Sequence, residues 1–234
     1  MTGRAWAAVV LLAVDGLIAG AHFFARLRET QLIRDVAAGR LVHMEELLDS
    51  DATIESLVRL HLFAFVLAAA FFLGWLYSAT KRAQAISAAP MAFTPRAAVL
   101  WWFVPLANLI QGYRTVDAVW KASDPTSQPG DPRYGQAPSG TWLLGAWWLT
   151  YLGGNIASRA LPSTLRGDET LDQLIQISQG AAVIWAVVAI AAVLAILVVR
   201  SIERRLAASE ANAAARSLTL SAPEINPGFP PPPA

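Results

Sequence analysis

The strongest constraint on the fold is the run of residues 181–199, which contains no charged side chain. A helix needs about 20 mostly apolar residues to cross the hydrocarbon core of a bilayer. Lipid offers no hydrogen-bond partners to peptide groups, so a crossing segment must satisfy its own backbone as a helix. The run therefore predicts a membrane-spanning helix.

Three further segments have the same character. The chain is 55% hydrophobic and only 15% charged, which is more apolar and less charged than soluble domains usually are. We predict an all-α fold, an integral membrane helical bundle with four transmembrane helices at about residues 5–25, 57–79, 141–158 and 179–200. A cleaved signal peptide is the alternative for the first segment, but that segment is long for one and contains Asp15.

Basic residues next to the predicted spans indicate their orientation. Lys81 and Arg82 follow the second span, and Arg200, Arg204 and Arg205 follow the last. Because cytoplasmic ends of spans carry an excess of Lys and Arg, both clusters are expected inside the cell. The first span then runs outward and the second inward, and the N- and C-termini are both cytoplasmic.

Between the second and third of these spans lies an aromatic segment, residues 95–121, that a proline interrupts. Thr94 and Pro95 are a helix-start signal, and Pro105 removes a backbone donor and breaks the helix. A kinked full crossing is one interpretation, and a re-entrant or interfacial helix is the other. A full crossing would place the final arginines outside, so the charge pattern favours the re-entrant or interfacial form.

The second half of this segment is amphipathic. Four apolar residues recur at helical spacing on one face, and charged residues occupy the other face; the apolar set is Leu109, Tyr113, Val116 and Trp120. Asp117 and Lys121 are spaced to form an ion pair along the helix. This is the pattern of a helix at a membrane surface.

The same segment carries a family resemblance. The run Trp101-Trp102-Phe103-Val104-Pro105-Leu106-Ala107-Asn108-Leu109, followed by Tyr113, Trp120 and the later pair Trp147-Trp148, resembles the signature of the domain-of-unknown-function 4328 family (DUF4328). The resemblance covers about residues 57–205 and implies a bacterial multi-pass protein of the cell membrane. It marks Trp101, Trp102, Pro105, Asn108, Tyr113 and Trp120 as a candidate functional or structural motif. The family has no established activity.

Asp15, His22, His61 and Asn155 are the candidate intramembrane polar residues of the predicted spans. Asp15 and His22 lie seven residues apart and so share a helix face. His22 ends one span and His61 begins its antiparallel neighbour, so the two rings are expected at similar depth. Intramembrane ionisable groups face the bundle interior or water. They are either packed, hydrogen-bonded residues or a contact for a proton or cation.

The remaining segments connect or follow the spans. The polar connector after the first span predicts short amphipathic helices broken near Gly39. Residues 122–140 are rich in Pro and Gly and predict a flexible loop. The membrane domain is expected to end near residue 205, and residues 206–234 predict a disordered, Pro-rich cytoplasmic tail.

The sequence carries no recognised catalytic motif. The sequence contains no phosphate-binding glycine loop, no metalloprotease helix and no nucleophile elbow. We therefore expect no catalysis and no cofactor, metal or catalytic residue, and a net charge of +1 does not suggest nucleic-acid binding. We expect a structural or regulatory membrane component whose partners are the lipid bilayer and a second copy or another membrane protein. The alternative is a small oligomeric transporter or channel-like protein with a polar path near Asp15, Asn108 and Asn155.

Overall fold

The computed structural model describes residues 1–86, 91–126, 142–160 and 170–221. In these ranges every regular element is helical. The elements are α1 (Gly3–Ala37), α2 (Met44–Ile86), α3 (Pro95–Leu100), the 3₁₀ helix η1 (Trp101–Phe103), α4 (Asn108–Ala122), α5 (Trp142–Ala160) and α6 (Leu171–Ser221).

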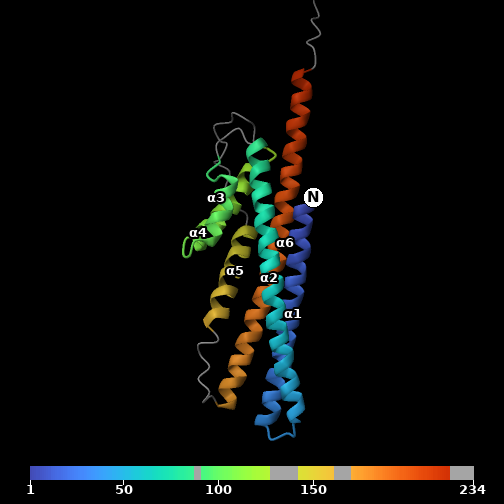
Figure 1. The fold of residues 1–234 in the computed structure, drawn as a ribbon, viewed down its shortest axis with the longest axis vertical. Coiled ribbons are helices and arrows are strands. Elements are labelled where there is room, and N and C mark those ends of the chain that lie inside the picture. Colours follow the sequence, from blue (N-terminus) through green and yellow to red (C-terminus); the bar gives the residue numbers. More distant parts are fainter. Residues whose placement is uncertain (87–90, 127–141, 161–169, 222–234) are drawn as a thin grey trace, which may run out of the picture.

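The long helices lie side by side as an elongated bundle (Figure 1). Helix α6 packs most extensively on α1 and then on α5, and α1 also packs along α2. The short helices α3 and α4 form a hairpin beside the upper part of α2 and α5 in the view of Figure 1. The bundle thus has four long elements and one hairpin at a single end.

Three helices are long and apolar enough to cross a membrane, namely α1, α2 and α6. The all-helical bundle and these three candidate spans agree with the sequence prediction. The predicted fourth span at residues 141–158 coincides with α5, which is not among the three.

The helices extend beyond the predicted spans. The connector does not form separate helices, because α1 continues to Ala37 and α2 already begins at Met44, with the turn at Gly39 in the left-handed region (φ 72°). Helix α6 continues to Ser221, so the structure differs from the disordered tail predicted from residue 206. This part of the chain is rich in Ala and other good helix formers, and Leu206 is buried. The rest of the predicted tail lies outside the described residues, as does most of the 122–140 loop.

One buried carboxylate joins three helices at the end where the chain begins. Glu203 on α6 is only 3% exposed. Its oxygens accept hydrogen bonds from the Trp75 indole at 3.1 Å, the Arg82 guanidinium at 2.8 Å and the backbone N–H of Thr2 at 3.1 Å. Arg82 also pairs with Glu210. A buried charge held by several donors ties the start of α1 to α2 and α6.

A second polar contact fixes the end of α4 on α6. The Arg205 guanidinium lies 4.2 Å from the centre of the Trp120 ring and 3.4 Å from the Asp124 carboxylate. Burial acts to raise the pKa of Asp124, but hydrogen bonds from Thr126 and the charge of Arg205 outweigh it and lower that pKa below its usual range. The Ser209 hydroxyl donates to the Ser123 carbonyl oxygen at 3.0 Å. The hairpin is therefore anchored to the extended part of α6.

The Glu203 contacts predict a large asymmetry between two neighbouring carboxylates. Replacing Glu203 with Ala leaves Arg82 and Trp75 without their buried acceptor, and we expect a loss of about 3 kcal/mol of stability. Replacing the more exposed Glu210 with Ala should cost less than about 1 kcal/mol. Thermal unfolding of both purified variants in detergent, followed by circular dichroism, measures the difference. Equal melting temperatures for the two variants would contradict the proposed role of Glu203.

Candidate functional site

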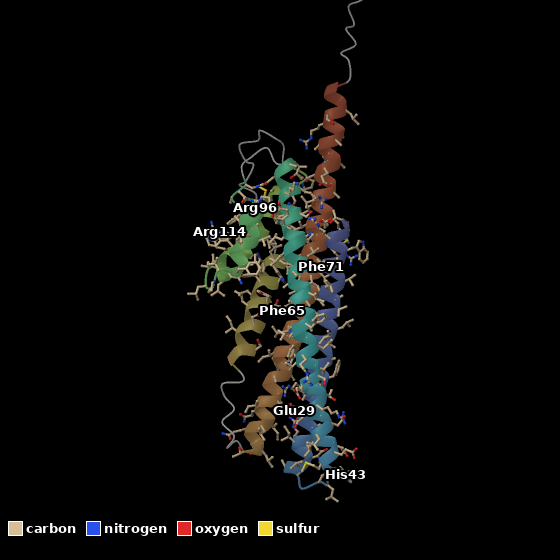
Figure 2. The ribbon with its side chains drawn as sticks, viewed as in Figure 1. Glu29, His43, Phe65, Phe71, Arg96 and Arg114 are labelled. Carbon is tan, nitrogen blue, oxygen red and sulfur yellow. The ribbon has the colours of Figure 1, made fainter. Side chains whose placement is uncertain are left out.

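A cavity of about 410 Å³ lies among the long helices. Its wall is made by α1, α2, α5 and α6, with Trp102 of the hairpin at one end. Most of the lining is apolar, including Phe65, which Figure 2 labels on α2. Helices α2 and α5 flank the cavity, and they meet through side chains at its aromatic end, where the Phe72 and Trp147 ring centres lie 5.8 Å apart. Ligand sites in proteins have this size and largely apolar character.

Aromatic rings form the end of the cavity near the hairpin. Trp102 lies 5.4 Å from Phe72, 5.7 Å from Trp148 and 6.2 Å from Tyr151 between ring centres. Edge-to-face and tilted pairs at such distances stabilise more than their buried area alone. The Trp102 indole also donates to the Thr115 hydroxyl at 3.3 Å. The aromatic cluster therefore docks the hairpin on α2 and α5.

The helix of the aromatic segment breaks at the predicted proline. After η1, Val104 is extended, Leu106 has a positive φ of 63°, and α4 begins at Asn108. The backbone N–H of Asn108 donates to the Val104 carbonyl oxygen at 3.0 Å, so backbone hydrogen bonds close the turn. The predicted cap is present too, because the Thr94 hydroxyl accepts a hydrogen bond from the Ala97 amide.

The side chain of Asn108 does not lie in the cavity wall: its oxygen is buried without a hydrogen-bond partner among the described residues, and Asn108 is absent from the cavity lining. The Trp148 indole reaches the hairpin and donates to the Leu109 carbonyl oxygen at 3.1 Å. The suggested polar path through Asn108 therefore has no support from its position.

The other motif residues hold the hairpin in place. Tyr113 faces Trp148 with ring centres 6.4 Å apart, Trp120 lies under Arg205, and Trp101 is half-buried at the start of η1. Gly112 is buried where a Cβ would come within 2.5 Å of the Trp148 ring. This close approach explains why a residue without a side chain stands there.

The polar wall of the cavity is centred on Asp15. This residue is 5% exposed, and its Oδ1 atom lies 3.1 Å from Nδ1 of His61 on α2. That separation suits an ion pair, but the angle does not suit a hydrogen bond, so both atoms lack a hydrogen-bond partner. A carboxylate buried this way is costly unless a positive charge stands near it.

His22 lies beside this pair, as its position in the sequence predicts. The His22 and His61 rings are 6.3 Å apart. Trp185 on α6 stacks on His22 at 3.8 Å and meets His61 edge-on at 4.7 Å. The fully buried His22 ring lies near the Leu57 backbone but makes no hydrogen bond of ordinary geometry.

Asn155 lines the same cavity from α5. Its amide donates to the Tyr151 carbonyl one turn earlier at 2.8 Å, and Thr150 and Ser158 line the wall nearby. Arg26 closes the opposite end from the aromatic cluster, and its charge is matched by Glu29 at 2.9 Å. The structure thus brings Asp15, His61 and Asn155 to one cavity, with His22 just behind them.

Sequence reasoning missed Trp185. The only signal for it was a single tryptophan inside the uncharged run, away from the span ends where tryptophans usually anchor. For metals, the described ranges contain no group of three or more His, Cys, Asp or Glu side chains arranged to hold an ion.

The three long apolar helices define a multi-pass helical membrane protein, and the cavity lies among its helices. The chain belongs to the family of the domain of unknown function DUF4328, whose model matches residues 38–204, more than half of the chain. His61, Asn155 and the hairpin lie inside the matched region, whereas Asp15 and His22 precede it. Neither a curated protein nor a solved structure matches the chain significantly.

The close contact at Gly112 gives a test of hairpin docking. Gly112→Ala places a methyl group against the Trp148 ring, and overpacking of this kind costs about 1–3 kcal/mol. We expect a lower melting temperature. Gly145→Ala on α5 is the control, because no atom lies within 4 Å of its added Cβ and helix propensity should make it neutral or slightly stabilising. A Gly112→Ala protein as stable as the control would mean that α4 does not pack on α5 as described.

Proposed function

We propose that this protein is a non-catalytic component of the bacterial plasma membrane that binds a small apolar or amphiphilic molecule in the cavity between α1, α2, α5 and α6. The observation that carries the proposal is the cavity itself, of about 410 Å³, with a largely apolar wall and a few convergent polar groups. Three of the helices that line it, α1, α2 and α6, are long and apolar enough to cross a membrane, so a molecule dissolved in the bilayer would lie beside the cavity.

The proposed arrangement has four crossings with both termini in the cytoplasm. Helix α5 would be the fourth span, and the α3–α4 hairpin would enter and leave on the cytoplasmic side. In Figure 1 the chain descends through α3, turns, and returns through α4 beside the bundle, which supports this arrangement. Leu106 at the turn is 81% exposed, as suits a residue in contact with lipid.

The bilayer is the first proposed partner, and a second copy or another membrane protein is the next. Large apolar side chains are exposed along the outer surface of the long helices, among them Leu17, Phe24, Leu62, Phe63, Val183 and Val193. On a bundle of this hydropathy such side chains are expected to face lipid.

A transporter that uses the same cavity is the second candidate. Asp15 and Asn155, two of the three residues suggested for a polar path, line the cavity. Flux of a bound ligand across reconstituted vesicles would favour transport, and it should fall in Asp15→Asn. Binding without flux under any imposed gradient favours the binding component proposed above.

Cysteine labelling tests the topology, because the chain contains no native cysteine. Single cysteines at the exposed positions Leu41 and Asp172 should react with an impermeant thiol reagent added outside intact cells. Cysteines at Ala92 and Thr126, which flank the hairpin, should react only after the membrane is opened, since the hairpin returns to the side it entered. Opposite labelling of Ala92 and Thr126 would show that the aromatic segment crosses the membrane.

Filling the cavity tests the binding proposal. Ala69 lines the cavity, so Ala69→Phe should place a ring inside it, whereas Leu62→Phe alters an exposed position on the same helix. We expect a photoreactive apolar benzophenone probe in detergent to cross-link to α2, α5 and α6 cavity residues in the wild-type protein and in Leu62→Phe. Cross-linking at those residues should fall at least tenfold in Ala69→Phe. Unchanged cross-linking in Ala69→Phe would overturn the proposal.

A further inference from the structure

We propose that the cavity selects a lipophilic cation, meaning an organic cation whose positive charge is carried on a bulky apolar body, and that Asp15 is its counter-charge. This inference rests on the proposed binding function and specifies the chemical class of the ligand. It comes from the joint presence of a buried carboxylate and several aromatic rings in the wall of one cavity, among helices that are apolar enough to cross a membrane.

The carboxylate of Asp15 is the first element. Asp15 is only 5% exposed, its Oδ1 atom accepts no hydrogen bond, and the residue borders the cavity. Buried charges in an apolar medium are stabilised by an opposite charge or by several hydrogen bonds. Among the described residues, the ionisable group that lies against Asp15 is His61, with its Nδ1 atom 3.1 Å from Oδ1.

The charged groups around the cavity leave Asp15 as the site for a cation. From α1, Arg26 also borders the cavity, but Glu29 and its two oxygens hold the guanidinium at 2.9–3.0 Å. From α2 the only titratable lining group is His61, and the described lining residues of α5 and α6 carry no charge. When the His61 ring is neutral, the carboxylate is uncompensated, and a bound organic cation would take the place of the histidine proton.

Aromatic rings supply the second element. Phe65, Trp102, Trp147, Tyr151 and Trp185 all line the cavity. The faces of aromatic rings attract cations, by as much as about 2 kcal/mol when the contact is desolvated. The same negative faces and the Asp15 carboxylate disfavour an anion. A compact inorganic cation would lose its water shell in this apolar wall, so a weakly hydrated organic cation fits best.

The surroundings of the cavity are the third element. Three of the four helices that line it, α1, α2 and α6, are long and apolar enough to cross a membrane. On one side of the cavity α1 and α6 pack closely at Gly16 and Ala192. Lipophilic cations partition into membranes, which places them beside these helices.

Three probes of similar size test the inference on the full-length protein in detergent at pH 8. They are tetraphenylphosphonium, the neutral triphenylphosphine oxide and the anion tetraphenylborate. We expect the phosphonium to bind at least tenfold more tightly than either of the others, as measured by isothermal titration. This comparison uses the wild-type chain, so it does not depend on the folding of any variant.

Substitutions then test whether the Asp15 carboxylate is the group that attracts the phosphonium. Asp15→Asn should weaken phosphonium binding at least tenfold, and Asp51→Asn, which removes the same charge from an exposed position, should leave it unchanged. His61→Gln should retain binding within about threefold, because it removes a competing proton site and leaves the carboxylate. A His61→Gln loss as large as that of Asp15→Asn would overturn the inference, since the pair would then act as one structural unit.

The outcomes separate this inference from the proposed function. If all three probes bind equally well and Asp15→Asn has no effect, the cavity binds apolar molecules but Asp15 does not select charge, and only the inference fails. If no probe binds and the benzophenone probe also fails to label the cavity, the proposed function fails as well.

Discussion

The contact on which the bundle depends is the set of hydrogen bonds around Glu203. A buried carboxylate is tolerated only where donors surround it, and here Trp75, Arg82 and the Thr2 amide come from two other helices. Because each donor occupies a set position along its own segment, the contact with Glu203 fixes how α1, α2 and α6 are aligned along the long axis of the bundle. This alignment in turn brings Asp15, His61 and Trp185 together farther along the bundle.

The break at Pro105 has a structural use beyond ending a helix. A continuous helix would carry its aromatic residues past the bundle, whereas the turn after η1 folds α4 back and leaves Trp102 against Phe72 and Trp148. The indole of Trp148 then satisfies a carbonyl of the hairpin, at Leu109. Aromatic packing thus connects the hairpin to the cavity, and movement of the hairpin would change the aromatic end of that cavity.

Contacts between residues close in the sequence could be predicted from it, whereas most contacts between different helices could not. The Thr94 cap and the Asp117–Lys121 pair each involve residues three or four apart. The proximity of His22 and His61 followed from antiparallel neighbours of known length. The partners of Glu203 and the stacking of Trp185 on His22 depend on which helices pack together, and no periodicity encodes that.

Different segments of the chain supply the apolar wall of the cavity and its negative charge. The part of the chain that matches the family supplies the apolar and aromatic wall, together with His61 and Asn155. The carboxylate comes from α1, which lies before the matched region. An apolar ligand would be buried mainly by α2, α5 and α6, whereas the proposed preference for positive charge rests chiefly on Asp15, with the aromatic rings adding to it. The two properties are therefore separable, because removing the Asp15 charge leaves the shape and the aromatic faces of the cavity in place.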